Sequence, residues 1–95
     1  MKQYILCAAV HYDDGIPHTH QPSNITSGFI VCGRRHHNCF TTVHIITQAT
    51  ISAKAVQGFL TNDDVFVNRQ YAAIIAFNAK QIPKLRKILY SEDLY

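Results

Sequence analysis

The stretch AVQGFLTNDDVFVNRQYAAIIAFNAKQ, residues 55–81, decides the fold class. Two short runs rich in β-forming residues, 55–61 and 65–67, lie on either side of the turn-forming tripeptide NDD at 62–64. Strand-forming runs joined by a short turn predict a β-hairpin. The pattern changes directly after the hairpin, which indicates a second kind of element.

A helix is predicted to follow the hairpin. Asn68 is a suitable N-cap, because its side-chain oxygen can accept a backbone N–H of the first helical turn. Side chains then recur at helical spacing, at Tyr71, Ile74, Ile75, Phe77 and Asn78. Pro83 cannot continue a helix, so we expect the helix to end near Gln81.

The N-terminal part of the chain adds two strands to the prediction. Residues 3–12 are apolar and tolerant of β structure, and the turn residues DDG at 13–15 end this strand. Residues 13–26 contain two prolines and many polar side chains, which is typical of a long loop. Residues 27–32 form a short apolar run that predicts a second, buried strand, antiparallel to the first.

Two further helices are less strongly marked. Residues 38–48 combine a helical stripe with many β-branched residues, and we favour a helix over a strand there. The tail, 84–95, has leucine and isoleucine at the spacing of one helical face, which predicts a short amphipathic helix ahead of the SED tripeptide at 91–93. Together these elements predict one α+β domain, residues 1–95, with a small antiparallel sheet and two or three helices.

Size and charge narrow the function classes. A chain of 95 residues and 10.8 kDa holds one core, and its 47% apolar composition exceeds what a lone sphere of this size needs, so we expect a homo-oligomer. Nine Lys and Arg against six Asp and Glu give a net charge of +3, which favours an anionic partner. No long basic run occurs, so duplex nucleic acid is disfavoured and small phosphorylated ligands are favoured.

Cysteine usage and hydropathy indicate the compartment. Cys7, Cys32 and Cys39 are an odd number of cysteines without a CxxC pair, which fits a reducing cytoplasm. The apolar stretch near the N-terminus is too short and too interrupted for a signal peptide or a membrane span. We therefore expect a soluble cytoplasmic protein without a membrane partner.

The strongest candidate site is the sequence GRRHHNC at 33–39. It follows a predicted strand and precedes a predicted helix, so two guanidiniums and two imidazoles would gather beside the N–H groups of a helix start. Arg34, Arg35, His36 and His37 are therefore candidate ligands for a phosphate. The alternative interpretation is a solvated basic turn.

The hairpin and the helix after it offer a second candidate site, with Gln57, Gly58, Phe59, Phe66, Arg69 and Asn78 as its members. The two aromatic rings on facing strands would present a surface to a nucleobase, and the glycine would allow close approach. The arginine and the asparagine of the helix would together take a phosphate or a ribose. The alternative is a hairpin whose aromatic side chains belong to the core.

Catalysis and metal binding are weaker interpretations. Zinc-ligand types occur at spacings that fit no recognised zinc pattern, and we expect no metal; they are His18, His20, His36, His37, Cys39 and His44. Cys39 beside histidines could be an activated thiolate, and Asp63-Asp64 could be paired carboxylates, yet neither has a supporting third group. We expect no enzyme activity and no cofactor.

Three separated strings give the chain a family resemblance. They are GRRHHNC, VQGFLTNDDVFVNRQYAAIIAFNAKQI and LYSEDLY, and they occur in that order. Through them, residues 27–40, 56–82 and 89–95 resemble small phage-encoded proteins of the first Thoeris anti-defence family.

The resemblance implies a signal sponge that acts in the cytoplasm of an infected bacterial host. Proteins of that family sequester cyclic ADP-ribose isomers made by TIR-domain defence proteins, and some members, as hexamers, also hold cyclic trinucleotides. The implied fold is a small antiparallel sheet with helices, assembled as dimers or trimers of dimers with ligand pockets between subunits. The motif Arg34, Arg35, His36 and His37 would then bind phosphate. Contacts to base, ribose and phosphate would come from Phe59, Thr61, Phe66, Arg69 and Asn78.

Two other function classes stay open. One is a small nuclease or cyclic-nucleotide phosphodiesterase that uses the histidines, and recovery of intact ligand would count against it. The other is an inhibitor module that binds another protein through its apolar surface, and it predicts no stabilisation by nucleotides.

Overall fold

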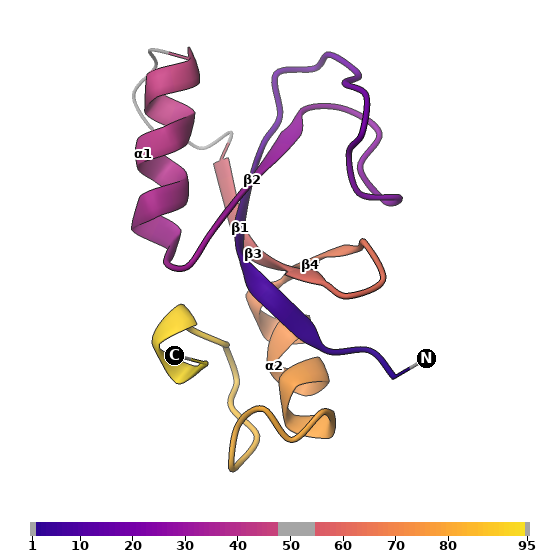
Figure 1. The fold of residues 1–95 in the computed structure, drawn as a ribbon, viewed down its shortest axis with the longest axis vertical. Coiled ribbons are helices and arrows are strands. Elements are labelled where there is room, and N and C mark those ends of the chain that lie inside the picture. The colour runs from indigo at the N-terminus through magenta and orange to yellow at the C-terminus, as the bar shows by residue number, and fades with distance from the viewer. Residues whose placement is uncertain (1, 48–54, 95) are drawn as a thin grey trace.

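Four strands form one antiparallel sheet in the computed structural model, which describes residues 2–47 and 55–94 (Figure 1). The strands are β1 (Ile5–Tyr12), β2 (Phe29–Gly33), β3 (Ala55–Thr61) and β4 (Phe66–Asn68). Their order across the sheet is β2-β1-β3-β4, and each neighbouring pair is antiparallel. The hairpin predicted from the sequence is therefore confirmed as β3 and β4.

Two helices cover one face of this sheet, α1 (His36–Thr47) and α2 (Arg69–Asn78). Directly opposed residues of antiparallel strands point to the same side, and the register opposes Phe59 to both Ala8 and Val67. These three side chains pack with α2 in one core cluster. Val10 points to the same side as Ala8 and packs with Cys39 of α1. The described residues thus form the predicted α+β fold.

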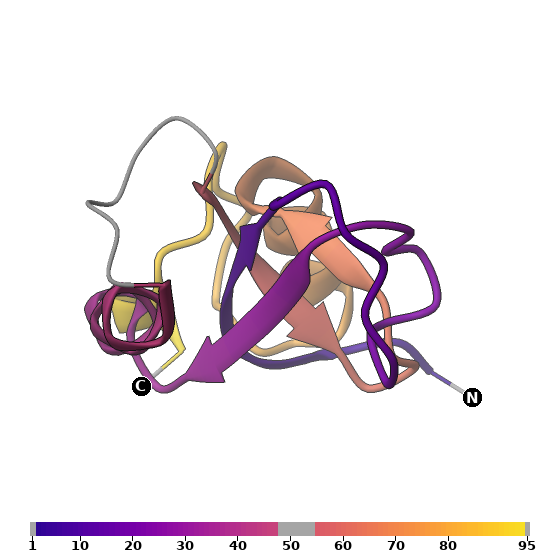
Figure 2. The same cartoon turned by 90° about the horizontal axis from the view of Figure 1, so that it is seen from above.

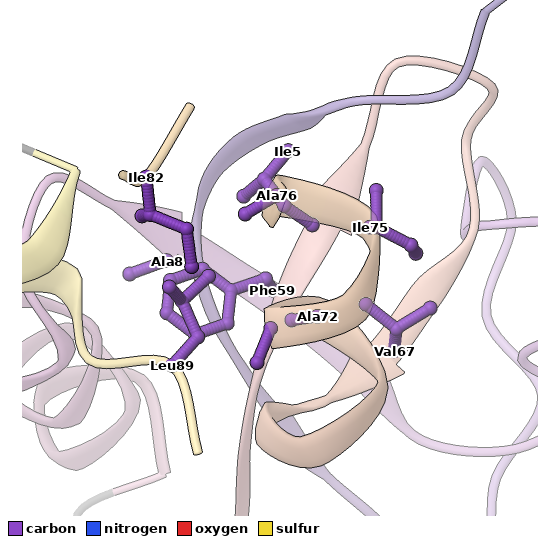
Figure 3. Close-up of a cluster of buried hydrophobic side chains, with 10 residues drawn as sticks. Ile5, Ala8, Phe59, Val67, Ala72, Ile75, Ala76, Ile82 and Leu89 are labelled. Carbon is purple, nitrogen blue, oxygen red and sulfur yellow. The ribbon is translucent and has the colours of Figure 1, made fainter. Parts of the chain in front are cut away.

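The main core lies between α2 and the sheet (Figure 3). Alanines on the inner side of α2 allow the helix to approach the strands closely, and the ring of Phe59 fills the space between them. Ile82 and Leu89 reach the same cluster from the chain after α2, and both are buried. The tail is therefore part of the packed fold.

Side-chain amides pair with backbone groups at the strand edges. Asn24, in the loop of residues 13–28, accepts the Phe66 N–H at 2.9 Å and donates to the Phe66 carbonyl at 2.7 Å. Gln81 makes the same two contacts with Ile5, each at 2.8 Å. The 13–28 loop and α1 lie on opposite sides of the strands (Figure 2). Since unpaired edges invite further strands, the amides protect β4 and the start of β1 from strand addition.

The two N-terminal strands agree with the sequence in direction and differ in detail. β1 begins at Ile5, two residues later than predicted, and ends at Tyr12, ahead of the predicted turn in which Gly15 has a φ of 77°. β2 is antiparallel to β1 as predicted. It is nevertheless an edge strand whose side chains are mostly half-buried, so the prediction of a buried strand is wrong.

The helices confirm two of the three that the sequence suggested. α1 begins two residues before the predicted start, and the predicted last residue, Gln48, lies outside the described residues. α2 follows Asn68 as predicted but ends at Asn78 rather than near Gln81, because Lys80 takes a left-handed φ of 62° that ends the helical backbone. In the part of the chain that is described, no helix has the length and apolar character needed to cross a membrane.

The amphipathic helix predicted in the tail is wrong. Residues 79–90 form turns and irregular backbone, and only a 3-10 turn, Ser91–Asp93, follows. The Leu89 N–H donates to the Arg69 carbonyl at 2.9 Å, and Leu89 is fully buried, whereas Leu85 is 58% exposed. The apolar side chains of the tail therefore do not share one face.

Candidate functional site

The candidate site lies where the start of α1, β3, the start of α2 and the tail come together (Figure 1). His36, the first residue of α1, reaches β3, and its Nε2 lies 2.8 Å from the Gly58 carbonyl oxygen. Because a carbonyl oxygen only accepts, Nε2 carries the hydrogen and donates it. The His36 ring also meets the Phe59 ring edge to face, with 5.0 Å between the centroids. His36 thus fastens α1 to β3.

The surroundings of His36 govern its charge. Burial lowers the pKa of His36 below its ordinary value of 6.5, and the positive charge of Arg69 lowers it further. The hydrogen bond to Gly58 and the negative charge of Glu92 act in the opposite direction. His36 is therefore neutral at pH 7, and its Nε2–H is donated to the Gly58 carbonyl rather than to a phosphate.

Arg69 begins α2 and is held from the tail. Its carbonyl accepts the Leu89 N–H at 2.9 Å, and its guanidinium carbon lies 5.7 Å from the centre of the Tyr90 ring. Asn68 caps the helix as predicted, since its Oδ1 accepts the Tyr71 N–H at 2.7 Å. The first turn of α2 contains no acidic residue. A guanidinium and the positive end of a helix dipole therefore coincide, which is a favourable place for an anion.

A hollow of about 230 Å³ opens beside Arg69, and its wall consists of Gln57, Asn68, Arg69, Gln70 and Ile88. The three amides and the guanidinium can donate to phosphate oxygens or pair with the polar edges of a base or ribose. The isoleucine adds an apolar contact. The volume is below the roughly 300–1,000 Å³ of typical ligand pockets, so one chain can enclose only part of a ligand of ordinary size.

The structure brings together five residues of the two predicted sites, His36, Gln57, Gly58, Phe59 and Arg69. Of these, only Gln57 and Arg69 line the hollow. Phe59 is fully buried beneath α2 and packs in the core, which is the alternative that the sequence left open. The shared region therefore has His36 and Phe59 packed on its inner side and Gln57 and Arg69 in the wall of the hollow.

The predicted pair of aromatic rings is wrong as a joint surface for a base. Leu60, rather than Phe59, is opposed to Phe66, so the two rings lie on opposite faces of the sheet. Phe66 covers Gly58, where an added Cβ would lie 2.6 Å from Phe66 Cζ. The Phe66 ring also meets the ring of His11 edge to face, 5.8 Å between centroids. Gly58 thus makes room for an aromatic ring of its own hairpin.

Thr61 and Asn78 lie apart from the hollow. Thr61 is fully buried; its hydroxyl donates to the Asp63 carboxylate and accepts the Val65 N–H at 3.1 Å, so it shapes the β3–β4 turn. Asn78 follows Arg69 by nine residues on α2, which corresponds to about 13.5 Å along the helix and half a turn around it. One phosphate or ribose cannot contact both, so the predicted joint role of Arg69 and Asn78 is wrong.

The GRRHHNC motif forms the turn between β2 and α1. Arg34 and His37 are exposed, and Arg35 is partly buried. Asn38 Oδ1 accepts the Arg35 N–H at 3.3 Å, which closes the start of α1 from within the helix. The motif therefore stands at a helix start as predicted, and His36 extends from it to β3 while the exposed pair faces solvent.

Sequence reasoning missed the contribution of the tail to this site. Ile88 lines the hollow, Tyr90 supports Arg69 and Glu92 acts on His36. No periodicity joins the tail to the start of α2, because irregular backbone makes the connection. The LYSEDLY string linked the tail to the family resemblance, but it does not indicate which residues the tail contacts. Gln70 was also missed, and Asn68 was identified only as a cap.

The groups considered for catalysis have structural roles. Cys39 is fully buried, and burial raises its pKa to about 11, so the thiol is protonated at pH 7. Asp63 accepts a hydrogen bond from Gln3 at 3.2 Å, and Asp64 has a φ of 64° in the same turn. Among the side chains that the structure describes, no group of three or more His, Cys, Asp or Glu is arranged to hold a metal ion.

Comparison with known proteins places the chain in a phage family. Residues 4–95 match a family model described as Phage T4 y16D protein. Neither a curated protein nor a solved structure matches the chain. Since the family match covers nearly the whole sequence, the protein belongs to the phage T4 y16D family.

Proposed function

We propose that the protein binds and sequesters a small anionic nucleotide without changing it. Cyclic ADP-ribose isomers are the first ligand class and cyclic trinucleotides the second, as the resemblance to the Thoeris anti-defence family implies. The protein would then block a defence signal in the cytoplasm of an infected bacterium. One observation carries the proposal: the hollow at the start of α2 combines Arg69 with the amides of Gln57, Asn68 and Gln70.

This set of groups suits a phosphate attached to a ribose and a base. A guanidinium can donate two parallel hydrogen bonds to a phosphate, and the start of α2 adds a partial positive charge in the same direction. The amides both donate and accept, as the edges of bases and ribose hydroxyls require. Tyr90 packs against Arg69 from the tail and limits the orientations that the guanidinium can take.

The size of the hollow supports an oligomeric binder. Sequestration needs nanomolar affinity, about 12 kcal/mol, which requires an enclosed pocket. The hollow of about 230 Å³ on one chain is too small to enclose a whole cyclic ADP-ribose isomer or cyclic trinucleotide, so a second copy would supply the rest of the wall. We therefore propose a dimer or a hexamer as the active form.

The roles of the histidine and cysteine side chains support binding over catalysis. His36 Nε2–H is committed to the Gly58 carbonyl, and the imidazole is neutral. The Cys39 thiol is buried and protonated. A hydrolase that uses these side chains would need both to be available to substrate.

Calorimetric titration with cyclic ADP-ribose isomers and with cyclic trinucleotides tests the proposal. Heating the complex and separating the released ligand by chromatography then distinguishes a sponge from a hydrolase. We expect tight binding and release of intact ligand, with a stoichiometry that reports the number of chains per ligand. A cleaved product would establish a hydrolase, and absence of binding would reject nucleotide sequestration.

Two arginine variants locate the site. Arg69→Gln removes the guanidinium from the hollow, and we expect affinity to fall about 10- to 100-fold, the usual effect of a lost charged hydrogen bond. Arg86→Gln is the matched control, because Arg86 pairs with Asp93 at 3.3 Å and lies outside this hollow. Equal weakening by both variants would mean that only net charge matters. A double Arg34→Ala, Arg35→Ala variant tests the start of α1 in the same way.

Binding to another protein is a second candidate function. The outer side of α2 and the tail expose large apolar side chains, Tyr71, Ile74, Phe77 and Leu85. A hollow of about 440 Å³ is lined by Ile74 and Leu85 together with Gln70, Arg86 and Lys87. If this surface alone carries the function, nucleotides will leave the melting temperature unchanged.

A further inference from the structure

Two cysteines lie side by side on the face of the sheet that the helices leave uncovered. Cys7 of β1 is opposed to Leu60, and Cys32 of β2 is opposed to Ala9, which stands two residues from Cys7. Since residues two apart on a strand share a face, both thiols point away from α1 and α2. Cys32 is exposed and Cys7 is half-buried.

The two thiols, on one face of neighbouring strands, influence each other's ionisation. The interaction between the two side chains lowers the pKa of Cys32 to about 7. The same interaction, together with burial, raises the pKa of Cys7. Cys32 therefore carries a substantial thiolate fraction at neutral pH, and the thiolate is the nucleophilic form of cysteine. Cys39, on the covered side of the sheet, has the opposite character because it is buried and protonated.

We propose that Cys7 and Cys32 form a thiol–disulfide site that reacts with small disulfides of the glutathione type. The Cys32 thiolate attacks one sulfur of the small disulfide, breaks its S–S bond and releases one small thiolate, which takes up a proton. Cys7 then gives its proton to solvent and attacks the Cys32 sulfur, releasing the second small thiol. The small disulfide is reduced to two thiols, and the protein loses two hydrogens and gains a Cys7–Cys32 bond.

The positions of Cys7 and Cys32 in the sheet permit a disulfide bond between them. Diagonal neighbours on adjacent strands have Cα atoms about 7–8 Å apart in a regular ladder, slightly more than the roughly 7 Å that a disulfide spans without backbone movement. Cys7 lies just outside the β1–β2 ladder, which starts at the Ala8–Gly33 pair, and the register of β1 against β3 shifts between Ile5 and Cys7. β2 ends at Gly33, directly after Cys32. Both cysteines thus stand near strand ends, where the backbone can adjust by the small amount that the bond requires.

Glutathione disulfide is the probe for the test, and intact mass with peptide mapping is the readout. We expect the folded wild-type chain to lose two hydrogens, with the new bond joining Cys7 and Cys32 and with Cys39 unmodified. The bond should open again with dithiothreitol. A chain that stops with glutathione on Cys32 and a free Cys7, or that does not react, would overturn the proposal.

Three single variants sharpen the result. Cys7→Ser should trap the mixed disulfide on Cys32, because the second attacking thiol is gone, whereas Cys32→Ser should react with glutathione disulfide at least about tenfold more slowly. Cys39→Ala is the matched control and should form the Cys7–Cys32 bond at the wild-type rate. Faster reaction at Cys39 than at Cys32 in the folded chain would contradict the assigned roles. A native circular dichroism spectrum for each variant ensures that the thiols are compared in the folded state.

Discussion

The two helices lie on the same face of one sheet, and the side-chain contacts described for them differ. We call β3, β4, α2 and the tail the α2 half, and β2 with α1 the α1 half. In the α2 half, Phe59 and Leu89 are fully buried within a large apolar cluster. Among the described side chains of the α1 half, Cys39 is the fully buried one, packed with Val10 of the central strand. The described contacts of α2 thus include a large apolar cluster, whereas those described for α1 are the packing of Cys39 with Val10 and the polar contact of His36.

This contrast predicts a large difference between truncations in the two cores. Phe59→Ala removes a fully buried ring from the α2 half and should cost about 3–5 kcal/mol of unfolding free energy. Cys39→Ala removes one buried sulfur from the α1 half and should cost about 1 kcal/mol. Urea denaturation of both variants measures the two values. Equal costs would mean that the α1 half is as tightly packed as the α2 half.

Replacing a glycine by alanine should also destabilise the α2 half more than the α1 half. At Gly58, an added Cβ would lie 2.3 Å from the Val67 carbonyl oxygen and 2.6 Å from Phe66 Cζ, so Gly58→Ala must displace β4. We expect a loss of about 2–3 kcal/mol. At Gly33, ahead of α1, the nearest atoms are Asn38 Cβ and Cys39 Sγ, both at 3.3 Å, and neither is backbone. Gly33→Ala should therefore cost less than about 1 kcal/mol by denaturation, and the reverse order would contradict the comparison.

Loss of the asparagine side chain at each helix start should change the free energy of unfolding by smaller amounts. Asn68 caps α2 through a hydrogen bond of 2.7 Å to the Tyr71 N–H, and Asn68→Ala should cost about 1 kcal/mol. Asn38 closes α1 through a longer contact of 3.3 Å to the Arg35 N–H, so Asn38→Ala should cost about half as much or less. Thermal melting at fixed pH resolves the two. A greater loss at Asn38 would show that α1 depends on its cap more than this geometry indicates.

The sequence predicts local features of the fold well and long-range contacts poorly. The β3–β4 hairpin and the Asn68 cap follow from residues close in the chain, where turn chemistry and side-chain reach are decisive. The end of α2 does not follow from nearby residues, because Gln81 forms hydrogen bonds with Ile5, which is distant in the sequence. The prediction of a tail helix is wrong for a similar reason, since the hydrogen bond from the Leu89 N–H to the Arg69 carbonyl fixes the backbone there.

In the candidate site, too, individual residues were predicted correctly and their arrangement in space was not. Arg69 and Gln57 were predicted and do line the hollow. The predicted joint surface of Phe59 and Phe66 is wrong, because two residues of facing strands share a side only where the register opposes them, and Phe66 is opposed to Leu60. Register decides the face of each residue, and a shift of one position reverses it. In a hairpin the turn type and loop length set the register, and the residue pattern of the two strands alone does not specify them.

The smallest effect concerns pH and the link between the two halves. His36 joins α1 to β3, and its pKa is lowered in the folded protein, chiefly by burial. The unfolded chain therefore takes up a proton first as the pH falls below 6.5, so this part of the stability is complete above pH 6.5 and is lost towards the lower pKa of the folded state. His36→Gln keeps a donor for the Gly58 carbonyl and cannot titrate. Melting temperatures from about pH 7.5 to 5 should fall less steeply for His36→Gln than for the wild type, while the exposed His37→Gln follows the wild type. Parallel slopes for His36→Gln and the wild type would mean that α1 and β3 are not coupled through a neutral imidazole.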